Sequence, residues 1–188
     1  PIYSKWFCDV YSPTGSKSML PGGSTTLSAK AYYAYVKEYE NGEKRTEEDH
    51  NKPYIAKWSL ANDNQTGITL TNGNDNKSVV VKADADILNN TDDVYVPIKL
   101  DIYDTDESVN EDRPVLSTTC DCRVEKQFYT MEVSGLKSDF YRDESMTLTP
   151  SVKKHFLNEE GKEITSDVAT ENVKFDWGSC SNLSVDVI

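Results

Sequence analysis

Strict alternation of apolar and polar residues most limits what this chain can fold into. The pattern is clearest from Val94 to Ile102, where nearly every second residue is Val, Ile or Leu. Successive side chains of a β-strand point to opposite faces of its sheet, so this alternation is typical of strands with one buried face. The same period recurs in the sets Trp6, Cys8 and Val10; Leu27, Ala29, Ala31, Tyr33 and Tyr35; Tyr54, Ala56 and Trp58; Ile68 and Leu70; Val79, Val81 and Ala83; and Leu116, Thr118, Cys120, Cys122 and Val124.

The segments between these runs favour tight turns. They include SPTGSK, LPGGS, ENGEK and TNGNDN, which are rich in the residues that accept turn geometries. No segment combines apolar spacings of three and four with helical capping residues. We therefore predict an all-β fold, a sandwich of about seven strands with short polar loops at both ends.

The chain also repeats part of itself. The stretch STTLSA at 24–29 is similar to SMTLTP at 145–150, an offset of 145 − 24 = 121 that places Leu27 on Leu148. Trp58 falls on Trp177 at an offset of 177 − 58 = 119, and we attribute the difference to a deletion in the intervening hairpin loop. This predicts one domain at 1–124 and the N-terminal part of a second at 125–188, truncated or completed by another segment.

The repeated residues are predicted to form the core. A tryptophan could offer a flat platform to a sugar, but Trp58 and Trp177 each end an inward-facing triplet and are expected to pack between sheets, together with Leu27 and Leu148. In the second copy 188 − 177 = 11 residues follow the tryptophan. A half-sandwich of this kind would expose an apolar face, which strands from a neighbouring chain could cover.

Composition excludes several classes of partner. The 20 Lys and Arg against 32 Asp and Glu give a net charge of −12, which repels nucleic acid and anionic membranes. No apolar run approaches the 18 or so residues that a membrane span needs. We therefore expect no nucleic-acid partner and no membrane insertion.

Four stretches together carry a family resemblance. The order LPGGSTTLSAKA, ENGEK, YIAKWSLAND and GITLTNGNDNKSVVVKADA resembles the bacterial immunoglobulin-like domains that are strung along adhesins, large surface proteins and bacteriophage virion proteins. The resemblance covers most of 5–124, and it extends over 125–188. It implies tandem immunoglobulin-like β-sandwiches, extracellular at the bacterial cell surface or in a phage virion as a decoration, fibre or tail component. The implied role is structural or adhesive, with other subunits, neighbouring domains, a host surface protein or a glycan as partner.

Enzymatic activity is not expected. The chain has no Gly-x-Ser-x-Gly elbow, and His50 and His155 stand beside charged neighbours. With 32 acidic residues, carboxylate pairs are abundant, and no pattern places two of them in an apolar cleft. No catalytic residue is therefore assigned.

The densest aromatic cluster is a candidate contact surface. Alternation assigns Tyr33 and Tyr35 to the core or its edge, which leaves Tyr32 and Tyr39 for contacts with a partner. If these two rings bind carbohydrate instead, the chain is a carbohydrate-binding module, and changing both to alanine abolishes its affinity for glycans.

The acidic stretch from Asp101 to Asp112 is a candidate site for calcium. Asp104, Asp106 and Glu107 supply the oxygens that calcium prefers, but the Asp-x-Asp-x-Asp-Gly spacing is missing. The alternative is a solvated loop that keeps the protein soluble, so we expect no cofactor.

The cysteines leave two interpretations open. Cys8 could form a disulfide with Cys120 or Cys122 if the first strand runs beside the last. Alternatively, these residues are small buried thiols in a reducing environment, which we favour because Cys180 has no partner in view.

Overall fold

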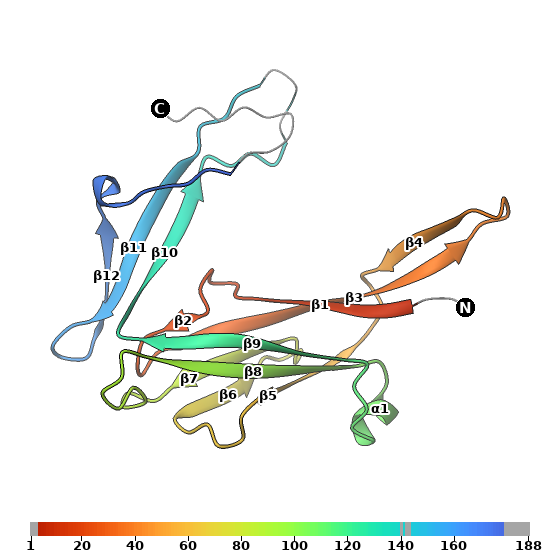
Figure 1. Ribbon diagram of the computed structural model, residues 1–188, viewed down its shortest axis with the longest axis horizontal. Coiled ribbons are helices and arrows are strands. Elements are labelled where there is room, and N and C mark those ends of the chain that lie inside the picture. Colours follow the sequence, from red (N-terminus) through yellow and green to blue (C-terminus); the bar gives the residue numbers. More distant parts are fainter. Residues whose placement is uncertain (1–3, 140, 142–143, 179–188) are drawn as a thin grey trace. The chain divides into compact units, whose positions relative to one another are not determined.

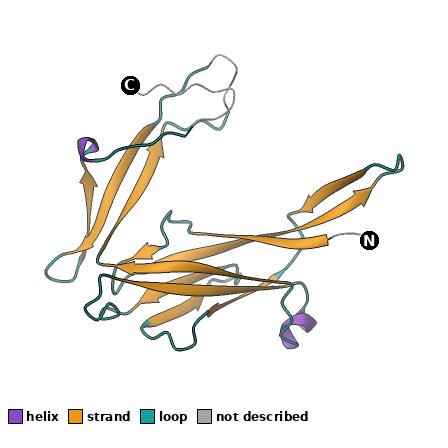
Figure 2. Ribbon diagram, in the orientation of Figure 1, coloured by secondary structure: helices purple, strands orange, loops and turns teal. Residues whose placement is uncertain are grey.

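The computed structural model describes residues 4–139, 141 and 144–178, and its regular structure is almost entirely β (Figure 1, Figure 2). The predicted all-β fold is confirmed. The chain divides into two compact units after Phe128, four residues beyond the predicted boundary. The strands are β1 (Ser4–Tyr11), β2 (Ser18–Met19), β3 (Ser24–Glu38), β4 (Lys44–Asp49), β5 (Ile55–Leu60), β6 (Ile68–Asn72), β7 (Ser78–Ala83), β8 (Asp93–Tyr103), β9 (Leu116–Glu125), β10 (Gln127–Ser134), β11 (Thr149–Leu157) and β12 (Glu163–Val168).

Unit 1 contains two sheets. One has the order β1-β3-β7-β6, with β4 also paired to β3, and the other has the order β2-β9-β8-β5. All of these pairs are antiparallel except that of β2 with β9, which is parallel. The two sheets face each other across one core, and the long β3 extends past it to carry β4 (Figure 1).

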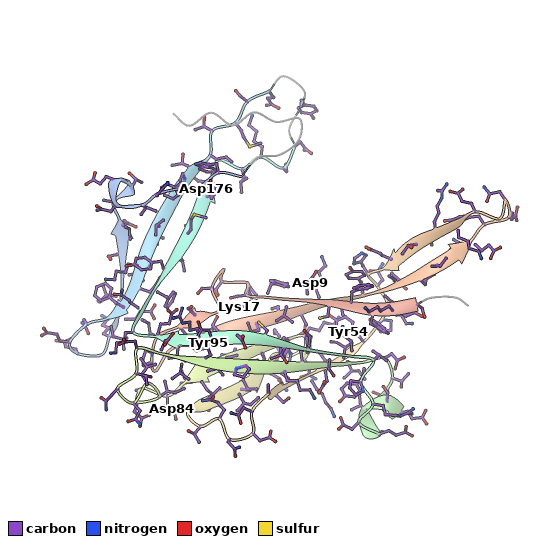
Figure 3. All side chains as sticks on the ribbon, in the orientation of Figure 1. Asp9, Lys17, Tyr54, Asp84, Tyr95 and Asp176 are labelled. Atoms are coloured by element: carbon purple, nitrogen blue, oxygen red, sulfur yellow. The ribbon has the colours of Figure 1, made fainter. Side chains whose placement is uncertain are left out.

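The alternating residues of the sequence supply the core of unit 1. The side chains of Leu27, Val79, Val81, Ile98 and Val124 are fully buried. Burial of apolar surface stabilises the sandwich by roughly 25 cal/mol per Å². Tyr54 adds a polar anchor, because its hydroxyl donates to the Ala29 carbonyl at 3.2 Å (Figure 3).

A charged edge strand ends the larger sheet beside the tip of β3. β4 reads KRTEED and pairs only with β3 among the described strands. The β3–β4 turn is tight: Gly42, at φ +78°, donates its N–H to the Tyr39 carbonyl at 2.8 Å. Charged side chains on an edge strand oppose pairing with other sheets, so β4 protects this edge.

The described residues of unit 2 form one sheet with the order β10-β11-β12. A short 3-10 helix, η1 (Thr170–Asn172), follows β12. Leu148 and Trp177 were predicted to be core residues, but both are only half-buried and neither lies in a strand. The reason is that the described residues of unit 2 offer no second sheet against which they could pack.

The β3–β4 and β11–β12 hairpins have the same register. Tyr33 pairs with Asp49, and Val152 pairs with Val168, so both partners differ by 152 − 33 = 168 − 49 = 119. The two turns are also equivalent, since Gly161 bonds Asn158 as Gly42 bonds Tyr39. The predicted deletion in the hairpin loop is therefore wrong: the offset of 119 already holds within the strands before the turn.

The sequence prediction also missed a short helix in the acidic stretch. α1 (Asp106–Asn110) begins after Thr105, whose hydroxyl accepts from the Ser108 N–H at 3.1 Å, while the Ser108 hydroxyl accepts from the Thr105 N–H. This reciprocal capping box stabilises a single helical turn. Five residues are too few to show the apolar periodicity by which longer helices are recognised.

Candidate functional site

The end of β3 carries aromatic rings on both of its faces. On the inward face Trp6 packs against Tyr33, with ring centroids 5.4 Å apart, and the Lys52 ammonium lies 3.6 Å from the Tyr33 centroid. Trp6 is buried. A cation over an aromatic face is attracted by the ring quadrupole. The Lys52 contact therefore holds the inward face of β3 against the rest of unit 1.

The outward face carries an aromatic row, which we define as Phe7, Tyr32 and His50. Phe7 and Tyr32 are direct cross-strand partners with nearly parallel rings 5.3 Å apart, and His50 stacks on Tyr32 at 4.7 Å. Lys5 lies over the Phe7 ring at 5.3 Å. Since Phe7 is 39% exposed, the row presents apolar surface to solvent within a rigid sheet.

The structure does not bring the two predicted contact residues together. Tyr32 stands in the aromatic row, with one neighbour stacked on each side of its ring. The Tyr39 hydroxyl donates to Glu47, which also accepts from Tyr35 at 3.0 Å, so Tyr39 lies on the Tyr35 side of the ribbon. Phe7 and His50, which the sequence analysis did not select, complete the row because strand pairing places them beside Tyr32.

Glu47 organises the β3–β4 hairpin. Its carboxylate accepts hydrogen bonds from Tyr39 and Tyr35, and the Lys37 ammonium lies 3.6 Å away. These tyrosine hydroxyls, that of Tyr39 first, hold the pKa of Glu47 below its usual 4.5. The same bonds raise the pKa values of both tyrosines.

The Glu47 contacts are expected to weaken in acid. Because the folded-state pKa is lowered, their stabilising effect is complete above pH 4.5 and is lost as the pH falls below that value. The ring-proton NMR shifts of Tyr35 and Tyr39 should therefore change between pH 6 and pH 3, and Glu47→Gln should remove this pH dependence. Glu48→Gln is the control, since Glu48 bonds His50 instead. Equal pH profiles for both variants would contradict the assignment.

The calcium candidates belong to the cap of α1. Asp104 accepts from the Ser108 hydroxyl at 3.3 Å, and Asp106 and Glu107 occupy the first helical turn, where acidic side chains are favoured. No group of three or more His, Cys, Asp or Glu side chains in the described part of the chain could hold a metal ion.

The structure does not contain the disulfide that the sequence left open. Cys8, Cys120 and Cys122 are free thiols. Burial raises the pKa of Cys8 to about 11 and that of Cys122 to about 12. These thiols are protonated at neutral pH and so are poor nucleophiles. Cys180 lies outside the described residues.

A hollow of about 410 Å³ at the β8–β9 end of unit 1 is lined by charged groups that pair with one another. Arg123 donates to Asp93 at 2.7 Å and lies 3.2 Å from Glu125, while Lys126 bonds Asp92 at 2.7 Å. The outward face of β8 also presents Tyr95, which is 59% exposed and lies under the Arg123 guanidinium (Figure 3). These pairs account for the charged groups that line the hollow, at one end of the two central strands of the sheet.

Comparison with known proteins returned no family model, curated protein or solved structure that matches this chain. Among the described residues, none of the helices has the length and apolar character to cross a bilayer. The geometry of the two units and of the aromatic row is therefore the basis for a functional proposal.

Proposed function

We propose that this chain is a non-enzymatic structural or adhesive module, built from tandem immunoglobulin-like sandwiches, of a larger protein displayed on a bacterial surface. The observation that carries the proposal is the strand order of unit 1. Immunoglobulin-type sandwiches place strands A, B, E and D in one sheet and C, F and G in the other. The orders β1-β3-β7-β6 and β5-β8-β9 match the orders of these two sheets, with β4 added beside β3 and β2 added beside β9.

The hairpin of unit 2 supports a tandem arrangement. The shared offset of 119 covers a strand pair and its turn, including the glycines at positions 42 and 161. Equal register over two paired strands is the result expected from duplication of one building unit, because register is set by the turn and by the apolar pattern together. Repeated domains of this kind extend a protein away from its anchor.

The aromatic row is the proposed adhesive surface. Aromatic rings enrich protein interfaces because they contribute large contact areas. Both sides of the Tyr32 ring are stacked against neighbours, so a sugar has no free face of that ring to cover. A protein surface that packs against the exposed edge of the row, and chiefly against Phe7, is the partner that this geometry favours.

Binding to host cells is expected to depend on Phe7. Beads coated with the chain should adhere to target cells, and Phe7→Ser should remove most of this adhesion because it interrupts the exposed apolar row. Tyr95→Ser is the matched control, since Tyr95 is an exposed aromatic residue on the other sheet. Equal losses in the two variants would contradict a role for the row.

The location of the chain, on the bacterial surface or in a virion, distinguishes the leading proposal from its alternative. Protease treatment of intact cells should release peptides of this chain, with lysed cells as the reference. If the chain is instead abundant in purified virions, it is a bacteriophage structural protein. A glycan-array signal that is lost in the variant with both Tyr32→Ala and Tyr39→Ala would identify a carbohydrate-binding module.

A further inference from the structure

Unit 2 has one polar face and one apolar face. On the polar face His155 contacts Thr130 at 2.8 Å and Thr165 at 3.3 Å, which joins all three strands. Strand alternation then assigns the other face. It consists of Tyr129, Met131 and Val133 from β10, Val152, Lys154 and Phe156 from β11, and Ile164, Ser166 and Val168 from β12.

The apolar face is open to solvent. Met131 is 62% exposed and Tyr129 is 54% exposed. Among the described residues of unit 2, no side chain is fully buried, whereas the core of unit 1 contains many fully buried residues. Contiguous apolar surface of this kind marks an interaction site, because its exposure to water is unfavourable.

Unit 1 shows what covers the equivalent face. By the offset of 119, Val152 corresponds to Tyr33, which packs against the core beneath the sheet β2-β9-β8-β5. The inward side chains of that sheet include Val96, Ile98 and Cys122, none of which is exposed. A three-stranded sheet with one apolar face becomes stable when a second layer packs on it.

Building on the sandwich architecture proposed above, we infer that the apolar face of unit 2 is the docking face for a second layer that contains the equivalents of β8 and β9, carried by the same polypeptide after Trp177, the equivalent of Trp58 in β5. The occupant is in the same polypeptide because duplication of the hairpin at constant register implies duplication of the strands that cover it. The offset places the equivalents of β8 and β9 at positions starting from 93 + 119 = 212 and 116 + 119 = 235. Each should alternate Val, Ile or Leu with polar residues.

Hydrogen exchange on two polypeptides tests this inference. In the 188-residue chain, amides of β10 to β12 should exchange faster than those of β3 and β8. In the natural polypeptide extended through position 244, which is 125 + 119, protection of β10 to β12 should rise on the order of tenfold or more. Equal protection of β10 to β12 in the two polypeptides would overturn the inference. A coding sequence without alternating strands at these positions would overturn it as well.

Two variants link the protection to the apolar face. Met131→Lys should abolish the added protection in the extended polypeptide, because it buries a charge under the second sheet. Glu132→Lys, on the polar face, should leave it intact, and both should be neutral in the shorter chain. Sedimentation that shows a dimer of the shorter chain, dissociated by Met131→Lys, would overturn the inference by identifying a second copy as the occupant. These results are independent of cellular location, so they can fail while the proposed display at the surface stands.

Discussion

Replacing Trp58 by alanine is expected to lower the free energy of unfolding of unit 1 by about 3 to 5 kcal/mol. Trp58 is only 8% exposed, and its indole N–H donates to the Asn76 carbonyl at 2.9 Å. The substitution therefore opens a cavity between the sheets and leaves a carbonyl without its donor. Urea unfolding followed by far-UV circular dichroism at neutral pH measures the change.

Trp177→Ala is the matched control for this prediction. Trp177 stands at the equivalent position by the offset of 119, but it is half-buried and lies outside the strands. Its removal should leave the unfolding midpoint of unit 1 unchanged. Equal destabilisation of unit 1 by the two substitutions would contradict the placement of Trp58 as its central core residue.

Alkaline pH is expected to destabilise unit 1 through buried acids that stay protonated in the folded state. Burial, reinforced by Cys120, raises the pKa of Cys122 from 9.0 to about 12. The contribution of this thiol to stability is complete below pH 9 and is lost as the pH rises from 9 to 12, because only the unfolded chain releases the proton. The corresponding slope is about 1.4 kcal/mol per pH unit.

Tyr103 adds to this loss at higher pH. Its ring is buried under the acidic loop and its hydroxyl donates to Asp112 at 2.8 Å. Burial first, and then this bond, raises the pKa of Tyr103 from 10.0 to about 12, so its contribution disappears between pH 10 and 12. As with the Cys122 thiol, this contribution to stability falls as the pH rises.

Urea midpoints at pH 8 to 11 under reducing conditions measure the alkaline effect. Cys122→Ala should lower stability at pH 8, because it removes a packed side chain, yet it should reduce the slope between pH 9 and 10, where the Cys8 thiol, whose pKa is also raised, contributes the remainder. Tyr103→Phe should leave that region unchanged and reduce the slope only above pH 10. An unaltered slope in Cys122→Ala would contradict the assignment.

Local pattern was sufficient to predict most strands of unit 1, but not the two-residue β2 or the charged β4. Val96, Ile98 and Leu100 alternate with polar residues along β8, and all three are buried in the structure. Such a pattern depends only on the geometry of an extended chain next to a core. The same alternating pattern correctly predicted that Leu27 and Trp58 lie inside the sandwich.

The candidate site depended on information that no local pattern contains. Phe7 and His50 join Tyr32 only through the register of three strands, and the residues are far apart in sequence. Tyr103 occupies an outward position of β8 by alternation, yet it is buried because α1 and its loop fold over that face. The assembly of the aromatic row and the burial of Tyr103 therefore both depend on tertiary packing.

The constant register of the two hairpins also limits how such a chain can change length. The repeat offsets of 121 and 119 differ by two residues, and the difference falls within β3, between Ala29 and Tyr33, rather than in the turn. Losing two residues returns every later side chain to its own face of the sheet, whereas losing one would reverse all of them. Evolutionary insertions and deletions in these strands should therefore survive in even numbers, and odd ones should be confined to the loops.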